Sequence, residues 1–214
     1  MFRTSLYRNM KTLFCLALFS VAGNATLLFV DSDAANTTNS SSQATVDLTG
    51  TLNPNPGWAA ALAGSNWISY GPTGDSGDPG YFSPANGTLV TFTTQFTLSG
   101  AITGGSLFVL ADDSTSVVLN TQVLIAADLT PGAVCSNVPV GCLQSTEAAF
   151  TFAQLAPYLV DGVNTLSFGV VQVGGGSFGL DFAGSVNDGS TPEPMTVALI
   201  GAGLVALATL RRRK

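Results

Sequence analysis

Hydrophobic and polar residues alternate along much of the central part of the chain. Between residues 90 and 98, apolar side chains fall on one face of an extended strand, and threonine and glutamine fall on the other. The apolar members are Val90, Phe92, Phe96 and Leu98. A period of two predicts a half-buried antiparallel strand. The alternation recurs at residues 166–170 and 178–182, whereas residues 107–111 form the continuous apolar run expected of a central strand.

Glycine- and proline-rich breaks divide these apolar segments into many short strands. Asn120 and Thr121 separate two apolar runs, 117–119 and 123–125, as a hairpin turn would. Residues 152–159 are the one short helical candidate of this part of the sequence. Many short strands joined by such turns predict an all-β fold, namely an antiparallel β-sandwich.

Charge is distributed unevenly along the chain. The seven basic residues all lie before residue 12 or after residue 210, and the chain contains no histidine. Twelve of the thirteen acidic residues lie between Asp31 and Asp188, where no cation is present to pair with them. Without Lys or Arg this part cannot neutralise phosphates, which excludes nucleic acid as a partner. Anionic surfaces repel it, whereas neutral glycans and divalent cations are compatible with its charge.

Residues 1–25 are typical of a secretory signal peptide. Three basic residues precede a short apolar segment at 13–22, and the small residues Ala22 and Ala25 follow, where a signal peptidase cuts such leaders. A buried core helix is the alternative interpretation, but a charged leader so close to Met1 has nothing to pack against. The N-terminus therefore predicts export across the inner membrane.

The rest of the chain divides into three predicted parts. Residues 26–43 contain a polar low-complexity run at 36–42, which predicts a flexible linker. Residues 44–188 carry the strand pattern and are expected to form the β-sandwich. Residues 189–214 form a C-terminal tail with a different pattern.

The tail contains sixteen uncharged residues, 195–210, followed by the basic cluster Arg211, Arg212, Arg213 and Lys214. As a helix, the uncharged segment spans about 24 Å, slightly less than the ~30 Å hydrocarbon core of a bilayer. The basic cluster favours the cytoplasmic side, which leaves the preceding domain outside. A short transmembrane helix is expected here.

Pro192, Glu193 and Pro194 stand immediately before this helix. A Pro-Glu-Pro motif, a short apolar helix and a terminal arginine cluster, in this order, resemble the PEP-CTERM sorting signal of Gram-negative bacteria. The resemblance implies that an exosortase recognises the three motif residues and cleaves near them, releasing a transiently anchored protein to the cell surface or medium. Thr191 stands where Val is usual, and a plain membrane anchor is the alternative. Similar tails occur on proteins labelled ice-binding, which says nothing about the domain itself.

Two stretches of the predicted domain resemble galactose-binding-like jelly rolls. They are VLADDSTSVVLN at residues 109–120 and LAPYLVDGVNTL at residues 155–166. The resemblance covers roughly residues 88–186 and implies a jelly roll with a sugar-binding or purely structural role. Thr121 departs from the pattern, because Gly commonly follows the Asn at this place.

Two cysteines remain once the signal peptide, which contains Cys15, is removed. Cys135 and Cys142 have six residues between them, and in an exported protein they most simply form a disulfide that closes a small loop. A zinc site is the alternative, but without His or further Cys it has no complete ligand set. No cofactor is expected.

A structural calcium ion is the one metal that the sequence suggests. Asp75 and Asp78 lie in the glycine- and proline-rich segment 71–80, and such loops supply the carboxylate and carbonyl oxygens that calcium takes. The alternative is turn chemistry, because Asp and Gly populate turns without binding anything.

Aromatic residues gather in the first half of the predicted domain. Trp58, Trp67, Tyr70 and Tyr81 are candidates for stacking on the rings of a neutral exopolysaccharide. The alternative is that the two tryptophans fill the hydrophobic core, as large aromatics mostly do.

Most catalytic arrangements are excluded by composition. Triads that use His and dyads that use Lys are impossible in a domain that has neither. Paired carboxylates alone can hydrolyse glycosides, so a secreted glycoside hydrolase is the alternative function. The expected function is non-enzymatic: an exported β-sandwich that is structural or glycan-binding at the cell surface or in the extracellular matrix.

Overall fold

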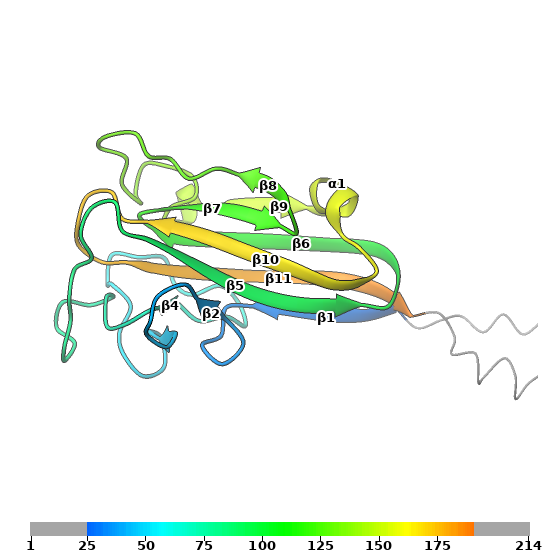
Figure 1. Ribbon diagram of the computed structural model, residues 1–214, viewed down its shortest axis with the longest axis horizontal. Helices are drawn as coiled ribbons and strands as arrows, with labels where there is room; N and C mark the ends of the chain where they lie inside the picture. Colours follow the sequence, from blue (N-terminus) through cyan, green and yellow to red (C-terminus); the bar gives the residue numbers. More distant parts are fainter. Residues whose placement is uncertain (1–24, 191–214) are drawn as a thin grey trace, which may run out of the picture. The chain divides into compact units, whose positions relative to one another are not determined.

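Two antiparallel β-sheets pack face to face in the computed structural model, which describes residues 25–190 (Figure 1). These residues form one compact unit of their own. The predicted all-β sandwich is therefore confirmed. Residues 1–24 of the predicted signal peptide, and residues 191–214 with the sorting motif, lie outside the described residues. Within residues 25–190 no helix has the length and apolar character needed to cross a membrane.

The first sheet is organised around its longest central strands. It contains β1 (Ala25–Asp31), β3 (Val46–Asp47), β4 (Ile68–Ser69), β6 (Gly100–Asp112), β9 (Ala148–Thr151) and β11 (Gly179–Ser190). The strand order is β3-β4-β11-β6-β9, and β1 also pairs with β11. β11 thus has β6 along one edge, and β1 followed by β4 along the other.

The second sheet is built on two ten-residue strands. It contains β2 (Thr38–Asn39), β5 (Leu89–Leu98), β7 (Ser114–Leu119), β8 (Gln122–Ile125) and β10 (Gly162–Val171), in the order β2-β5-β10-β7-β8. Short helical turns connect the sheets: η1 (Gln144–Thr146), α1 (Phe152–Leu155) and η2 (Ala156–Tyr158).

Hydrophobic periodicity predicted the long central strands of both sheets and the hairpin of the second. Along β5, buried and more exposed residues alternate as expected, with Thr94 as an additional inward side chain. The apolar run 107–111 lies in β6, between β11 and β9. β7 and β8 form the expected hairpin, and Asn120 at its turn has φ 56°. The single helical candidate is confirmed as α1 followed by η2.

The main core lies between the two sheets. Phe92, Phe168 and Phe182 are fully buried, and the rings of Phe168 and Phe182 stack with centroids 4.4 Å apart. Each buried side chain of this size contributes roughly 1.5–3 kcal/mol relative to exposure. Without cations in residues 25–190 there are no ion pairs in this part, so apolar burial and hydrogen bonds hold the sandwich together.

A second, smaller core lies on the opposite face of the first sheet. Its fully or almost fully buried members are Leu48, Trp67, Leu110 and Cys142, with Trp58 packed against them. The Trp58 and Trp67 rings lie over Gly179, where an added Cβ would come within 2.7 Å of Trp58 and 3.4 Å of Trp67. Only glycine permits this close approach, so the segment that carries the tryptophans packs directly on the backbone of β11.

The interpretation of residues 26–43 as a flexible linker is wrong, because β1 and β2 lie within it. β1 pairs with β11 along its whole length, and Val30 is buried. The polar run is ordered by local hydrogen bonds, since Asn39 donates to Thr45 and accepts from Ser41. Such bonds let Ser and Asn form turns. The folded unit therefore spans residues 25–190 instead of 44–188.

Candidate functional site: a polar groove at the open edge of the sandwich

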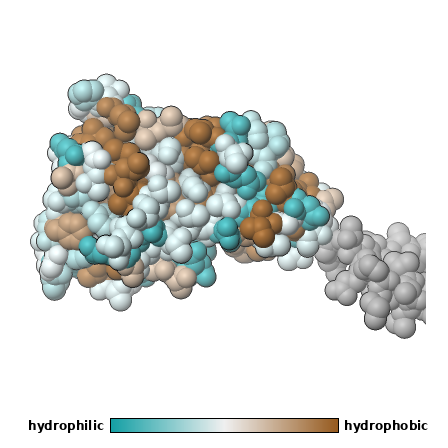
Figure 2. Space-filling model, viewed as in Figure 1, coloured by the Kyte–Doolittle hydropathy of each residue, from teal (hydrophilic) through white to brown (hydrophobic). Residues whose placement is uncertain are grey.

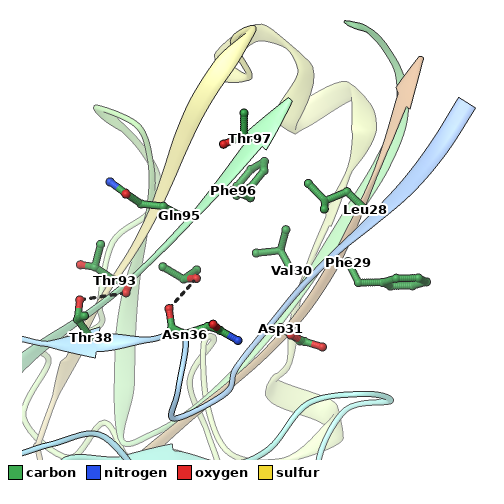
Figure 3. A pocket seen from close by; sticks show the side chains of 11 residues that line it. Leu28, Phe29, Val30, Asp31, Asn36, Thr38, Thr93, Gln95, Phe96 and Thr97 are labelled. Atoms are coloured by element: carbon green, nitrogen blue, oxygen red, sulfur yellow. Dashed lines mark hydrogen bonds between the residues drawn. The ribbon is translucent and has the colours of Figure 1, made fainter. Parts of the chain in front are cut away.

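A groove with a volume of about 530 Å³ opens where the edges of the two sheets face each other (Figure 3). It is lined by residues 28–31 of β1, by Asn36 and Thr38, and by residues 93–97 of β5. β1 is held in place by β11 and β5 by β10, so the two walls come from different sheets. The groove is thus positioned by the sandwich itself.

The groove exists because β5 is only partly covered along one edge. β2 pairs with β5 at just two positions, Thr38 with Thr93 and Asn39 with Phe92. Beyond this point no strand of the described residues pairs with that edge of β5. Backbone N–H and C=O groups of an uncovered strand edge are available for hydrogen bonding.

The lining combines an apolar floor with neutral polar groups. Figure 3 shows Leu28 and Val30 of β1 on one side and Phe96 of β5 on the other. Some polar groups already have protein partners, since Thr38 Oγ1 donates to Thr93 O and Gln95 Nε2 to Thr165 Oγ1, both at 3.3 Å. Asp31 is the one carboxylate of the lining. The chemistry suits an uncharged ligand with hydroxyl groups and an apolar face.

The sheet face that carries β5 and β10 is mostly pale in Figure 2, with separate apolar groups among polar ones. Its outward residues include threonines and Gln95 from β5, as the alternating pattern predicts. The groove borders this face, so a long polymer could continue from the groove over neutral polar surface.

The four aromatic candidates lie elsewhere. Trp67 is 0% exposed and Tyr70 9% exposed, so neither ring is accessible to a sugar in this structure. Trp58 is half-buried, with its ring centroid 4.3 Å from that of Trp67. Tyr81 is also half-buried, and neither Trp58 nor Tyr81 lines the groove. The core interpretation thus applies to Trp67, while Trp58 and Tyr81 as glycan contacts remain predictions.

The two aspartates suggested for calcium serve local hydrogen bonds. Asp78 is buried and accepts from the backbone N–H and the side-chain amide of Asn53, both at 2.7 Å. Asp75 accepts from Gly77 N at 2.8 Å, as in an aspartate turn. Over residues 25–190, these two aspartates are not part of any group of three ligand side chains. The calcium site stays a prediction.

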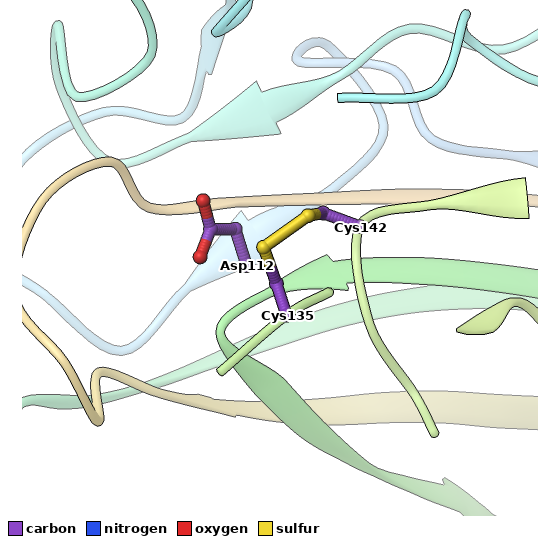
Figure 4. Close-up of side chains that lie close together, drawn as sticks. All are labelled: Asp112, Cys135 and Cys142. Carbon is purple, nitrogen blue, oxygen red and sulfur yellow. A yellow bond between two sulfur atoms is a disulfide. The ribbon is translucent and has the colours of Figure 1, made fainter. Parts of the chain in front are cut away.

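Cys135 and Cys142 form the expected disulfide, with Cα atoms 4.9 Å apart (Figure 4). The bond closes a loop with a sequence separation of 7, for which loop-closure entropy gives about 2–3 kcal/mol of stabilisation. Cys142 belongs to the second core. In the part of the chain that the structure describes, Asp112 with these two sulfurs is the one cluster of metal-type ligands, and the disulfide occupies the sulfurs.

Asp112 is a buried carboxyl beside the disulfide. Its Oδ2 accepts a hydrogen bond from Trp58 Nε1 at 2.6 Å. Burial raises the pKa of Asp112 from 3.8 to about 8, and the adjacent Asp113 adds to the rise through a hydrogen bond and its charge. The hydrogen bond from Trp58 opposes the rise. Asp112 is therefore a structural group that joins the Trp58 segment to the end of β6.

Asp181 has a similar structural role in β11. Its carboxylate is fully buried and accepts from Ser32 Oγ at 2.9 Å, Ser65 Oγ at 2.6 Å and Leu62 N at 2.8 Å. Burial raises the pKa of Asp181, and these three hydrogen bonds oppose that rise. Both buried aspartates are used to fasten loops to the first sheet.

Sequence reasoning did not find the groove. The alternation of β5 placed Thr93, Gln95 and Thr97 on a polar face, but nothing indicated that residues 28–31 would form the opposite wall. The apolar stretch at 27–30 was the available signal, because a linker has no reason to contain four consecutive large apolar residues.

No protein-family model matches the chain, and no curated protein matches it. Among solved structures it is similar to a family 35 carbohydrate-binding module from Clostridium thermocellum, with 12% identity, a TM-score of 0.37, and coverage of 73% of this chain and 97% of the module. It is also similar to the Podospora anserina GH26-CBM35 β-(1,4)-mannanase, with 16% identity, a TM-score of 0.28, and coverage of 81% of this chain and 27% of that protein. Both TM-scores lie below 0.5, so neither likeness supports an assignment of function.

Proposed function

We propose that this chain is an exported, non-catalytic β-sandwich of jelly-roll type that holds a segment of a neutral polysaccharide in the groove between β1 and β5. The observation that carries the proposal is the lining of that groove: an apolar floor, amide and hydroxyl side chains, and one carboxylate. Sugars present an apolar C–H face together with many hydroxyl groups, which such a lining complements. The volume of about 530 Å³ falls within the range of ligand pockets.

Charge favours a neutral ligand over an anionic one. Residues 25–190 contain carboxylates and no Lys, Arg or His. The carboxylates of this domain would repel an anionic polymer, and no cation in residues 25–190 offsets that repulsion. Neutral exopolysaccharide carries no such penalty.

Binding is favoured over hydrolysis. Glycoside hydrolases generally use two carboxyl groups that flank the scissile bond, roughly 5–9.5 Å apart. Asp31 is the one carboxylate that lines this groove, and Asp112 and Asp181 are buried in hydrogen-bonded positions. The groove therefore has a set of binding groups without the acid and nucleophile that hydrolysis needs.

Replacing Asn36 with Ala is expected to weaken polysaccharide binding by about tenfold, because its exposed amide lines the groove and one hydrogen-bonding side chain contributes roughly 1–1.5 kcal/mol. Affinity electrophoresis and calorimetry with a panel of neutral polysaccharides measure the effect. Gln122→Ala is the matched control, since Gln122 also carries an exposed amide and lies outside the groove. Turnover of chromogenic glycosides, or equal binding by both variants, would refute the proposal.

Delivery to the cell surface is the second part of the proposal, and it is supported by the order of motif, apolar segment and basic cluster in the tail. Signal peptidase would process the N-terminus and an exosortase the C-terminus. Replacing Pro192, Glu193 and Pro194 together with Ala is expected to leave the protein unprocessed in the inner membrane. Mass spectrometry and fractionation in a Gram-negative host with an exosortase test this, with Thr191→Ala as the control. Normal release of the triple variant would favour a passive anchor.

A further inference from the structure

β1 leaves one backbone edge without a strand partner among residues 25–190. It pairs with β11 from Ala25–Gly189 to Asp31–Ala183, and with no other strand. In the same register, Ser32 donates its backbone N–H to Phe182 O at 2.8 Å. Because bonding directions alternate along an antiparallel strand, the even-numbered residues face β11. The N–H and C=O groups of Leu27, Phe29 and Asp31 therefore point to the open edge.

The side chains on this strand are unusual for an open edge. Phe29 is 68% exposed and Leu27 48% exposed, and both lie on the outer face of the first sheet. Figure 3 shows the Phe29 ring directed away from the groove. Residues 25–30 contain no charge and no proline, whereas exposed edges are normally protected by charged residues, proline or bulges. Such an edge is suited to pairing with another strand.

We propose that β1 is the strand through which two copies of this chain pair, antiparallel and edge to edge, to form a dimer with one continuous sheet. In the register we propose, the two-fold axis passes between the Leu28 residues of the two copies. Odd-numbered residues of one strand then lie opposite odd-numbered residues of the other. Leu27 lies opposite Phe29 of the second copy, and Phe29 opposite its Leu27. Each contact then occurs twice, as a two-fold symmetric interface requires, and the four exposed apolar side chains gather on one face, where cross-strand pairs stabilise a sheet.

Charge selects this edge for self-association. Every domain carries acidic groups and no cations, so two copies repel each other over most of their surface. Residues 25–30 offer a strand-long contact without charge. In this register Asp31 lies opposite Ala25, and the Asp31 residues of the two copies are separated by about 20 Å along the strands. The pairing thus brings the uncharged edges together and keeps the two Asp31 carboxylates apart.

The pairing also determines where the two grooves lie. The two-fold axis of an antiparallel pair is perpendicular to the sheet, so the inner faces of both copies point to the same side. The groove of each copy borders the inner side of β1, and the two grooves are therefore neighbours across the interface. Dimer formation itself does not depend on what the grooves bind.

The test is sedimentation velocity on residues 25–190, the compact unit that contains both cores, over a range of protein and sodium chloride concentrations. We expect a concentration-dependent shift from monomer to dimer. Added salt should strengthen the dimer, because it screens the repulsion between the carboxylates. A dimer that weakens on adding salt would contradict the proposal.

Two substitutions of Phe29 examine the interface in different ways. Phe29→Pro removes an N–H that faces the open edge and leaves the bonds to β11 intact, a position where strands tolerate proline. Phe29→Asp keeps the backbone and adds two carboxylates near the two-fold axis. Each is expected to weaken dimerisation tenfold or more, with an unchanged circular dichroism spectrum. Leu129→Asp is the control, because it adds the same charge at an equally exposed site outside the strands, and its dimer should persist.

A monomer at all concentrations and salt levels would overturn the proposal, as would a dimer that survives both Phe29 variants. Association seen only with the full chain would overturn it as well, because residues 1–24 or 191–214, and not the β1 edge, would then make the contact between copies. Open-ended fibres in place of a dimer would also overturn it, because strand edges other than that of β1 would then pair.

Discussion

The free energy of unfolding of residues 25–190 should decrease by about 3 to 5 kcal/mol as the pH rises from about 4 to about 8. The main cause is Asp112, whose burial raises its pKa in the folded protein from 3.8 to about 8. The folded protein therefore holds a proton that the unfolded chain releases. This stabilisation is fully present below pH 3.8 and is lost as the pH rises through about 8.

The magnitude follows from the size of this pKa rise. A rise from 3.8 to about 8 corresponds to an upper bound of about 5 to 6 kcal/mol, which relaxation and water entry at the ionised site reduce. Asp113 and Trp58 are the groups that act on Asp112. Asp181 acts in the same direction, because burial raises its pKa too. The exposed Asp128 opposes the trend, since hydrogen bonds from Thr130 lower its pKa.

Denaturant unfolding of the wild type and of Asp112→Asn at several pH values tests this prediction. The amide keeps an acceptor for Trp58 Nε1 but cannot ionise, so the decrease between pH 4 and 8 should become much smaller. Asp161→Asn is the control, because Asp161 is exposed and the variant should retain the wild-type pH dependence. Greater stability at pH 8 than at pH 5 would contradict the assignment to Asp112.

Replacing Trp67 with Ala is expected to lower the free energy of unfolding by about 3 to 5 kcal/mol. The Trp67 side chain is fully buried, and its ring packs 4.3 Å from that of Trp58. Its Nε1 donates to Ala59 O at 3.1 Å. Removing the indole leaves a cavity at the centre of the second core and an unsatisfied backbone carbonyl.

Urea unfolding at constant pH measures this loss as a lower midpoint. Leu129→Ala serves as the control, because Leu129 is 63% exposed and its truncation should change stability by less than about 0.5 kcal/mol. A loss below about 1 kcal/mol for Trp67→Ala would show that the second core contributes little to holding the loops on the first sheet.

The sequence predicted the elements whose signals are local. Alternation of apolar and polar residues identified β5 and β10, because in a strand neighbouring side chains point to opposite faces. The turn at Asn120 and the pairing of Cys135 with Cys142 were predictable for the same reason, since each joins residues close together in the chain. The absence of cations, and with it the exclusion of nucleic acid, is a property of composition alone.

Contacts between distant residues were decided only by the tertiary structure. β1 was mistaken for a linker because its partner, β11, lies more than 150 residues further along the chain, as the pairing of Leu28 with Val186 illustrates. The groove needs β1 and β5 side by side, and its existence depends on β2 covering only two residues of β5.

Trp67 and Asp112 show the same division within single residues. The sequence left Trp67 open as a sugar platform or a core residue, and its position over Gly179 decided for the core. The sequence shows Asp112 only as one of two adjacent aspartates, whereas its raised pKa comes from burial at the end of β6 and from the neighbouring Asp113. Residue identity determined what each side chain can do, and packing determined which neighbours it has and how much water reaches it.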